Sequence, residues 1–409
     1  MRWASASAVG SDLPALLDRV VGEVLRALAG KPAHAAFVFL GPDHASRSAL
    51  VRDRVRDALP GASLVGGTAM GVVGGGREHE SPAALAVAAA HLPGVEVRAL
   101  HVTQERLPSQ DAPPGAWQAL FGVAPAARPS FVWVADPFSI RPDALVAGLD
   151  FAYPGHVTVG GLASGASGPG EQVLFCDERL VRTGAVGLAL SGDVVVVPAV
   201  AQGCRPFGPV MRVSACQDNL LISLDGEPAM DAVSRVLREA AERDRSLARV
   251  SALFLGIDAD PFAAPDDEGP WLVRNFLGRE RDGAGLFVGE MLRQGRRVRL
   301  HVRDRVTSAE DLDRTLRRCA ERTGPACAGA LLFSCLGRGM GLYGVPDHDT
   351  RAFQTRFPDV ALGGFFCSGE IGPVGGTTYL HGFTSSFGLF LPRDGAGGTA
   401  GDAGGAGSR

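Results

Sequence analysis

The chain has 409 residues, of which 46% are hydrophobic and 21% are charged, so it can bury a sizeable core in two or three domains. Its 44 acidic and 40 basic side chains give a formal net charge of -4, and no dense Lys/Arg tract lies outside residues 293–305. This balance argues against nucleic acid or an anionic membrane surface as partners.

The N-terminal residues 1–14 lack the long apolar run of a signal peptide. The apolar stretch 185–201 is interrupted by Ser191, Gly192 and Asp193, which favours two strands joined by a tight turn over a membrane span. Seven cysteines, an odd number without a C-x-x-C pair, are typical of a reduced protein. We therefore expect a cytoplasmic protein.

An amphipathic helix is predicted near the N-terminus, because apolar residues recur at helical spacing from Leu13 to Leu28. A unit then occurs three times along the chain: an apolar strand, an amphipathic helix, a second apolar strand and a paired glycine. In the first copy the strands are 36–40 and 63–65, and the helix covers residues 47–59. The loop after its second strand consists of Gly66, Gly67, Thr68, Ala69, Met70 and Gly71.

The second and third copies repeat this order. The second has a strand at 131–134, a helix over 142–151 and a strand at 157–159, and its loop begins with Gly160 and Gly161 and includes Ser164. The third has a strand at 330–333, a helix over 350–357 and a strand at 360–362, followed by Gly363, Gly364 and, further on, Ser368. By this alignment, one extra residue separates the glycines of the third loop.

Further strand candidates follow each loop, and a strand, helix and strand of this length is compatible with a right-handed parallel crossover. The expected fold is mixed α/β, with repeated strand–helix–strand units covered by helices and sheets extended antiparallel by the added hairpins. A later helix is predicted to start at a capping box formed by Ser308 and Asp311.

Three segments carry a resemblance to a known family: Phe207–Pro209 with Leu224–Ala229, then Leu332–Gly339, and finally Gly364–Pro373. In their order and spacing, and together with Val65–Gly71 and Leu286–Glu290, they are similar to FIST proteins. The resemblance implies a FIST N-terminal domain over residues 1–226 with the first two copies, and a FIST C-terminal domain over 227–393 with the third. Residues 394–409 are a Gly/Ala-rich tail that we expect to be disordered.

The resemblance also implies a function, namely an intracellular sensory module that binds a small ligand such as an amino acid. FIST domains of this kind occur in bacterial signalling proteins and beside an F-box in eukaryotic ubiquitin-ligase receptors. The stretch before the first strand is too short for an F-box, and no kinase, cyclase or receiver-like segment follows, so we expect a separate signalling partner protein to provide the output.

Arg338 is the best candidate to meet a ligand carboxylate, because a guanidinium fork matches a carboxylate bidentately, and Glu370 could pair with an amine. A salt bridge between Arg338 and Glu370 is an equally good interpretation. The paired glycines either contact the ligand or satisfy the backbone alone. The expected ligand-binding residues are Arg338, Glu370, Cys335, Gly66, Gly67, Thr68, Gly160, Gly161, Ser164, Gly364 and Ser368.

Two other functions compete with the sensor. One is a protein-interaction adaptor resembling the F-box-associated FIST receptors. The other is an enzyme with Cys335 or Cys367 as nucleophile and His348 or His381 as base, which we consider the weaker hypothesis because a cysteine that ends an apolar strand is usually inert. No metal or cofactor motif is present, so we expect no catalytic residues, no metal and no cofactor.

Overall fold

A computed structural model describes residues 1–245, 247, 253–260, 270–281 and 283–393. By internal contacts the chain forms two compact units, of which unit 1 comprises residues 1–200, 314–373 and 378 onward, and unit 2 comprises residues 201–313 and 374–377. The expected domain boundary at residue 226 stays a prediction, and the expected disordered tail lies outside the described residues. None of the helices described is both long and apolar enough to cross a membrane.

Unit 1 contains three copies of one supersecondary repeat. Each copy has a first strand, a helix, a strand–helix–strand crossover, a two-stranded hairpin and a last strand. The first copy consists of β1 (Arg2–Val9), α1 (Leu13–Leu28), β2 (Ala35–Leu40), η1 (Pro42–Arg47), α2 (Ser48–Ala58), β3 (Ser63–Thr68), β4 (Val72–Gly74), β5 (Arg77–His79) and β6 (Ala84–His91).

The second copy follows directly and has the same order. It consists of β7 (Val95–Val102), η2 (Gln104–Arg106), α3 (Pro114–Phe121), η3 (Pro125–Ala127), β8 (Ser130–Ala135), α4 (Pro142–Ala152), β9 (Val157–Leu162), β10 (Leu174–Cys176), β11 (Arg179–Val181) and β12 (Ala185–Gly192).

The third copy is interrupted in sequence by unit 2, which follows its first strand. It consists of β13 (Val195–Ala201), α6 (Arg305–Thr323), η5 (Gly324–Ala326), β21 (Gly329–Cys335), α7 (Gly339–Tyr343), α8 (His348–Arg356), β22 (Ala361–Cys367), β23 (Glu370–Val374), β24 (Thr377–His381) and β25 (Ser385–Leu391).

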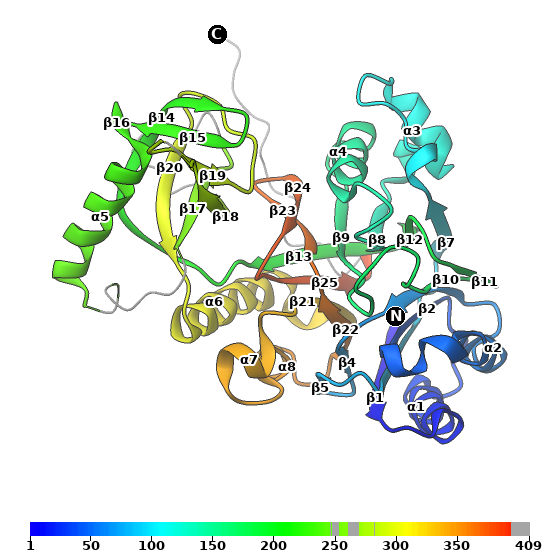
Figure 1. Cartoon of the computed structure of the whole chain (residues 1–409). Helices are drawn as coiled ribbons and strands as arrows, with labels where there is room; N and C mark the ends of the chain where they lie inside the picture. Colours follow the sequence, from blue (N-terminus) through cyan, green and yellow to red (C-terminus); the bar gives the residue numbers. More distant parts are fainter. Residues whose placement is uncertain (246, 248–252, 261–269, 282, 394–409) are drawn as a thin grey trace, which may run out of the picture. The chain divides into compact units, whose positions relative to one another are not determined.

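Each copy provides the central strands of one six-stranded sheet in the described part of the chain. Sheet 1 has the order β1-β6-β2-β3-β10-β11, sheet 2 the order β24-β23-β9-β8-β12-β7, and sheet 3 the order β13-β25-β21-β22-β4-β5. In every sheet the crossover strands are parallel and the other pairs with a recorded register are antiparallel. The predicted mixed α/β architecture is therefore confirmed, and helices flank the sheets in Figure 1.

The hairpins are exchanged between copies in a cycle. The hairpin of the first copy, β4–β5, pairs with β22 of sheet 3. The hairpin of the second, β10–β11, pairs with β3 of sheet 1, and that of the third, β23–β24, pairs with β9 of sheet 2. No copy therefore completes its own sheet, and the three form one interlocked structure.

The inner faces of the three sheets share one buried core. In it Phe39 of sheet 1 stacks on Phe365 of sheet 3 with ring centroids 4.6 Å apart. The outer faces are covered by the copies' own helices: α1 and α2 pack on sheet 1, α3 and α4 on sheet 2, and Phe353 of α8 stacks on Phe387 of sheet 3. The predicted helix from Leu13 to Leu28 coincides with α1.

The stretch 185–201 forms the two expected strands, joined at Asp193 and Val194, and the strands belong to different sheets, β12 to sheet 2 and β13 to sheet 3. The expected capping box is corrected. Helix α6 begins before the predicted capping box: Asp304 caps it, because its Oδ1 accepts hydrogen bonds from the amides of Val306 and Thr307.

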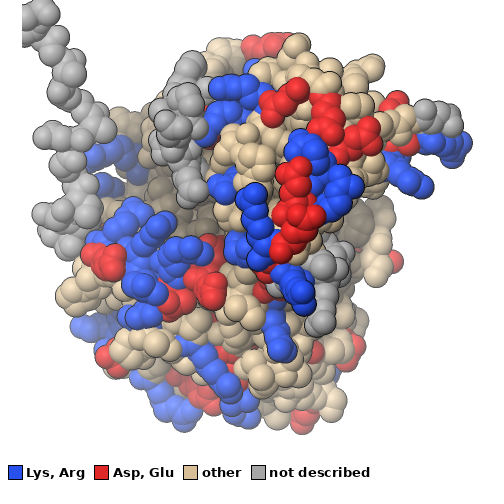
Figure 2. Space-filling model, turned by 90° about the vertical axis from the view of Figure 1, so that its left-hand side faces the viewer, with Lys and Arg blue, Asp and Glu red and all other residues tan. Residues whose placement is uncertain are grey.

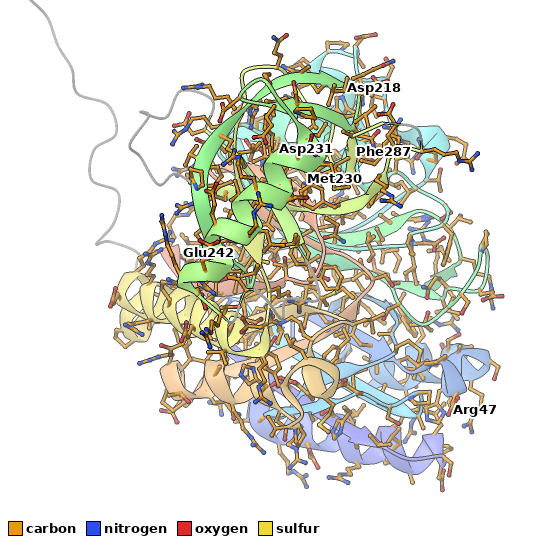
Figure 3. All side chains as sticks on the ribbon, turned by 60° about the vertical axis from the view of Figure 1, so that its left-hand side comes forward. Arg47, Asp218, Met230, Asp231, Glu242 and Phe287 are labelled. Atoms are coloured by element: carbon orange, nitrogen blue, oxygen red, sulfur yellow. The ribbon has the colours of Figure 1, made fainter. Side chains whose placement is uncertain are left out.

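Unit 2 has a sheet of its own. Its described strands form the order β14-β20-β17-β18-β19-β15-β16. Helix α5 (Ala229–Arg243) packs on this sheet, and Figure 3 labels Asp231 near its start and Glu242 near its end. The strands are β14 (Arg205–Gln217), β15 (Leu220–Leu224), β16 (Glu227–Pro228), β17 (Leu253–Asp258), β18 (Trp271–Arg279), β19 (Leu286–Val288) and β20 (Arg297–Val302).

Candidate functional site

The three loops that follow β3, β9 and β22 are hydrogen-bonded to one another. The amides of Ser164 and Gly165 donate to the Thr68 carbonyl at 3.3 and 3.1 Å, and the Ser368 amide donates to the Leu162 carbonyl at 3.1 Å. The structure therefore brings together the predicted residues Thr68, Ser164 and Ser368, of which only Ser368 is exposed.

The hydroxyls of this loop cluster bind protein atoms. Thr68 Oγ1 donates to Gln172 Oε1 at 2.6 Å. Ser164 Oγ donates to the Phe366 carbonyl and accepts from the Met70 amide at 3.1 Å. These side chains fasten the loops to each other, and their contact with a ligand stays a prediction.

The glycines are required by the backbone. Gly66, Gly160 and Gly364 have φ values of +156°, +157° and +149°, and an added Cβ would lie 1.8, 2.2 or 1.9 Å from a carbonyl oxygen of the parallel strand. Gly67 and Gly161 also lack room, because a Cβ there would meet side-chain atoms at 2.9 and 2.2 Å. The geometry supports the backbone interpretation, while ligand contact by these glycines is untested.

The same geometry corrects the alignment of the third copy. Gly364, rather than Gly363, has the positive φ shared by Gly66 and Gly160. With Gly364 as the equivalent residue, the next loop glycine lies five positions later in all three copies, at Gly71, Gly165 and Gly369. The apparent extra residue in the third loop therefore does not exist.

Arg338 is fully buried and forms an ion pair that the sequence did not reveal. Its Nε and Nη2 donate to Asp349 at 2.8 and 3.0 Å, and Nη2 also donates to Tyr343 Oη at 2.5 Å. Burial alone would lower the pKa of Arg338, but the neighbouring negative charges, with that of Asp349 first, hold it above its usual range. The charge of Glu370 contributes to this effect.

Asp349 is the centre of the network. The hydroxyls of Ser334 and Ser385 donate to its Oδ2, and His348 Nδ1 lies 3.0 Å from its Oδ1. Burial would raise the pKa of Asp349, but Arg338 and these hydrogen bonds hold it well below the usual range. The sequence predicted a helix over 350–357, next to Asp349, and α8 lies there, but the sequence did not reveal the partner of this side chain.

Comparison of the three copies shows that this network is peculiar to the third. The strand registers and helix ends align four buried polar residues of this region with two buried apolar residues each in the other copies. Asp349 corresponds to Val51 and Leu145, Glu370 to Val72 and Leu174, Ser334 to Leu40 and Ala135, and Ser385 to Leu85 and Ala185.

Two further acids are buried: Glu370 in β23 of sheet 2 and Glu78 in β5 of sheet 3. Glu370 Oε2 accepts from the Thr384 amide at 3.0 Å, and Glu78 Oε1 accepts from the Thr350 amide at 2.6 Å. Burial, reinforced by the charge of Asp349, raises the pKa of Glu78 to about 8. Glu78 was missed in the sequence because it lies in the exchanged hairpin of another copy.

The two cysteines considered as nucleophiles are buried side by side. Cys335 and Cys367 pair in register on β21 and β22 and are 9% and 0% exposed. Burial raises the pKa of the Cys367 thiol well above its usual value. All seven cysteines fall in the described part of the chain, and no disulfide is recorded among them.

A pocket of about 300 Å³ lies at the other end of sheet 2, where β8 and β9 begin. Because β8 and β9 are parallel, the segments that lead into them meet at one edge of the sheet. The polar residues that line it include Arg128, Ser130, Tyr153, His156 and Arg393. None of these was predicted, although aligning Pro60, Pro154 and Pro358 would have marked His156 as unusual.

Acidic and basic side chains are interspersed over the face drawn in Figure 2. Among the described residues, no group of three His, Cys, Asp or Glu side chains is placed to hold a metal ion.

Comparison with known proteins identifies the family. Residues 34–227 match the FIST N domain and residues 229–373 match the FIST C domain. An uncharacterized protein of Mycobacterium tuberculosis is 33% identical over 364 residues, covering 88% of this chain and 92% of that protein. An uncharacterized protein of Mycobacterium bovis is 31% identical over 370 residues, covering 90% and 94%.

Two more distant similarities were found. An F-box/LRR-repeat protein of Arabidopsis thaliana is 25% identical over 158 residues, covering 36% of this chain and 28% of that protein. A crystal structure of cyanuric acid hydrolase from A. caulinodans has 8% identity and a TM-score of 0.32, and covers 96% of this chain and 99% of its own. FIST domains are sensory modules of signal transduction, and this chain, matched over nearly all its length, belongs to the FIST family.

Proposed function

We propose that this protein is a cytoplasmic sensor that binds a small ligand in the pocket of sheet 2 and passes the signal to a separate partner protein. The observation that carries the proposal is the pocket itself. Its volume of about 300 Å³ is at the lower end of the range for small-molecule sites, and it combines apolar walls with a few polar groups.

The predicted site around Arg338 fits a different role in this proposal. Its guanidinium is fully buried and committed to Asp349 and Tyr343, so a ligand carboxylate would have to displace a buried ion pair. We propose that the network holds the third copy in one arrangement. The burial of Cys367 and the rise in its pKa support a binding protein over a cysteine-dependent enzyme.

Thermal unfolding in the presence of a library of amino acids and other small metabolites tests the sensor. A ligand at roughly 100 times its Kd should stabilise the protein by about 2.7 kcal/mol. Val195→Trp, which fills the pocket, should abolish this effect, whereas Val9→Trp at an exposed strand end should preserve it. A library without any stabilising compound would count against the sensor.

The adaptor hypothesis is favoured by one observation, the similarity to the F-box/LRR-repeat protein. An adaptor predicts a stoichiometric partner that binds equally well with and without small ligands, and that is insensitive to Val195→Trp. A sensor predicts that binding of its partner changes when the pocket is occupied or filled.

A further inference from the structure

The walls of the sheet 2 pocket set its chemistry. Pro125, Pro129 and Pro154 line it together with valines 194–196, so much of its surface is rigid and apolar. Such walls suit the hydrocarbon part of a ligand, and preformed walls lose little entropy when a ligand binds. The selectivity must therefore come from the few charged groups.

Those charged groups are two guanidiniums. Arg393 is held in place, because its Nε and Nη2 donate to the carbonyls of Gly192 and Val194, each at 2.9 Å. Arg128 is exposed, and no side-chain hydrogen bond or ion pair is recorded for it in the described structure. Among the described residues that line the pocket, none is acidic.

The nearest carboxylates are already bound by backbone amides. Asp193 Oδ1 accepts from the Arg393 amide at 2.8 Å. Asp150, whose Oδ1 lies 3.7 Å from His156 Nε2, accepts from the amide and the hydroxyl of Thr378 at 2.7 and 2.8 Å. Neither carboxylate lines the pocket, so the charged side chains that do line it are the two arginines.

His156 forms an uncharged part of the pocket. Nδ1 lies 2.6 Å from the Tyr153 carbonyl and Nε2 lies 2.7 Å from Thr158 Oγ1, so both ring nitrogens are satisfied by the protein. Burial lowers the pKa of His156 even though the charge of Asp150 opposes the shift. The imidazole is therefore neutral at pH 7, and the charge of the pocket comes from the two arginines.

The internal repeat shows that these polar groups are specific to the second copy. Arg128 lies two residues before β8, the first strand of its crossover. The residues two positions before the equivalent strands β2 and β21 are Ala33 and Cys327, and both are buried. In the loop after the crossover helix, the equivalents of His156 are Ala62 and Val360. The fold itself therefore does not require an arginine or a histidine at these positions.

Arg128 also has a backbone conformation that opposes its presence. Its φ of +47° is one that residues with a side chain rarely adopt, and its amide donates to the Pro125 carbonyl at 2.8 Å. Glycine would adopt this conformation without strain, so an arginine here points to a role for the side chain.

From the two arginines, the apolar walls and the departure from the internal repeat, we infer that this pocket binds a small organic anion, with its acidic group on Arg128 and Arg393 and its hydrocarbon part against the prolines and valines. The inference rests on the proposed function and specifies the ligand class of the same site. A guanidinium group binds carboxylate and phosphate alike, so the acidic group of the ligand is either a carboxylate or a phosphate ester.

Binding of four matched probes to the full-length protein tests the inference: benzoate, phenyl phosphate, neutral benzamide and cationic benzylamine. One of the two anions should bind at least tenfold more tightly than benzamide, and its identity distinguishes a carboxylate from a phosphate ester. Arg128→Ala should weaken the anion at least tenfold, and Arg128→Lys less. Arg26→Ala, at an exposed arginine of α1 without a recorded side-chain partner, should leave affinity unchanged.

Equal binding of benzamide and the anions, absence of anion binding, or unchanged affinity in Arg128→Ala would overturn the inference. Unfolding curves of each variant establish that it is folded. If the metabolites that stabilise the protein are neutral and lose their effect in Val195→Trp, the proposed sensor function is supported and the anion site is wrong. If Val195→Trp leaves stabilisation by every metabolite unchanged, the assignment of the ligand site to this pocket is wrong as well.

Discussion

Arg338 and Asp349 form an ion pair with 0% and 2% of their side chains exposed, and the other copies have buried Val51 and Leu145 at the position of Asp349. Burying two charges costs free energy that their attraction only partly returns, so such a pair contributes more to a unique arrangement than to stability. The polar side chains around this ion pair form hydrogen bonds mainly with one another. At the scale of single residues, the third copy has a polar core in a fold whose other two copies use an apolar one.

Asp349→Asn tests this pair. The substitution keeps the shape of the side chain but removes the negative charge that pairs with the buried guanidinium of Arg338. The loss of this charge should destabilise the protein by about 3–5 kcal/mol. Asp143→Asn is the matched control, because Asp143 pairs with Arg141 on the surface, and its loss should cost less than about 1 kcal/mol. Urea denaturation measures both, and similar costs would contradict the buried pair.

Glu78 should make stability fall with rising pH. Because its folded pKa of about 8 lies above the usual value of 4.5, its favourable contribution is complete below pH 4.5 and is lost as the pH rises through 8. Glu78→Gln keeps the carbonyl acceptor without the charge. The free energy of unfolding of the Glu78→Gln variant, relative to that of the native protein, should therefore increase between pH 5 and 8 and level off above pH 8. Denaturation at several pH values measures this difference. A constant difference would show that Glu78 ionises normally.

At the scale of elements, the parallel crossover strands approach so closely that the second strand must contain glycine. Gly66, Gly160 and Gly364 occupy the same register position opposite Val38, Trp133 and Leu332. The one glycine that the three motifs share is thus explained by backbone geometry, independent of any ligand.

Gly160→Ala tests the close approach. Its Cβ would lie 2.2 Å from the Trp133 carbonyl oxygen, so the strands must separate, and we expect a loss of at least about 2 kcal/mol. Gly22→Ala is the control, and the opposite effect is expected. Gly22 lies in α1, where an added Cβ would meet no neighbouring atom within 4 Å, so alanine should stabilise the protein by about 0.5–1 kcal/mol. Chemical denaturation distinguishes the two, and a neutral Gly160→Ala would contradict the geometry.

At the scale of the whole molecule, the cyclic exchange of hairpins makes the copies of unit 1 depend on one another. The first copy supplies β4–β5 to sheet 3, while β3 and β9 are completed by hairpins from the second and third copies. The shared inner core adds the same dependence through side chains such as Phe39 and Phe365. Unit 1 should therefore unfold as one cooperative body.

Fragments test this dependence. Residues 1–226 contain the first two copies but lack β22 and β23, so we expect no cooperative unfolding transition. By contrast, a chain in which a short Gly/Ser linker replaces residues 204–303 of unit 2 should remain cooperative, since the Gly203 amide lies 2.8 Å from Asp311 Oδ2, close to where the chain leaves this segment. The fluorescence of Trp3, Trp117 and Trp133, all buried in unit 1, reports on both proteins. A cooperative transition in the 1–226 fragment would disprove the interlock.

The sequence by itself determined the mixed α/β class, the threefold unit, helix α1 and the family, because all of these depend on local periodicity, glycine positions and ordered motifs. Only the tertiary structure decided which sheet each hairpin joins, which glycines are equivalent, that Asp349 is the partner of Arg338, and that a pocket with two arginines lies where β8 and β9 begin. The physical reason is distance along the chain. Glu78 meets Thr350, and Arg393 reaches Gly192, through contacts between residues some two hundred or more positions apart, which periodicity cannot specify.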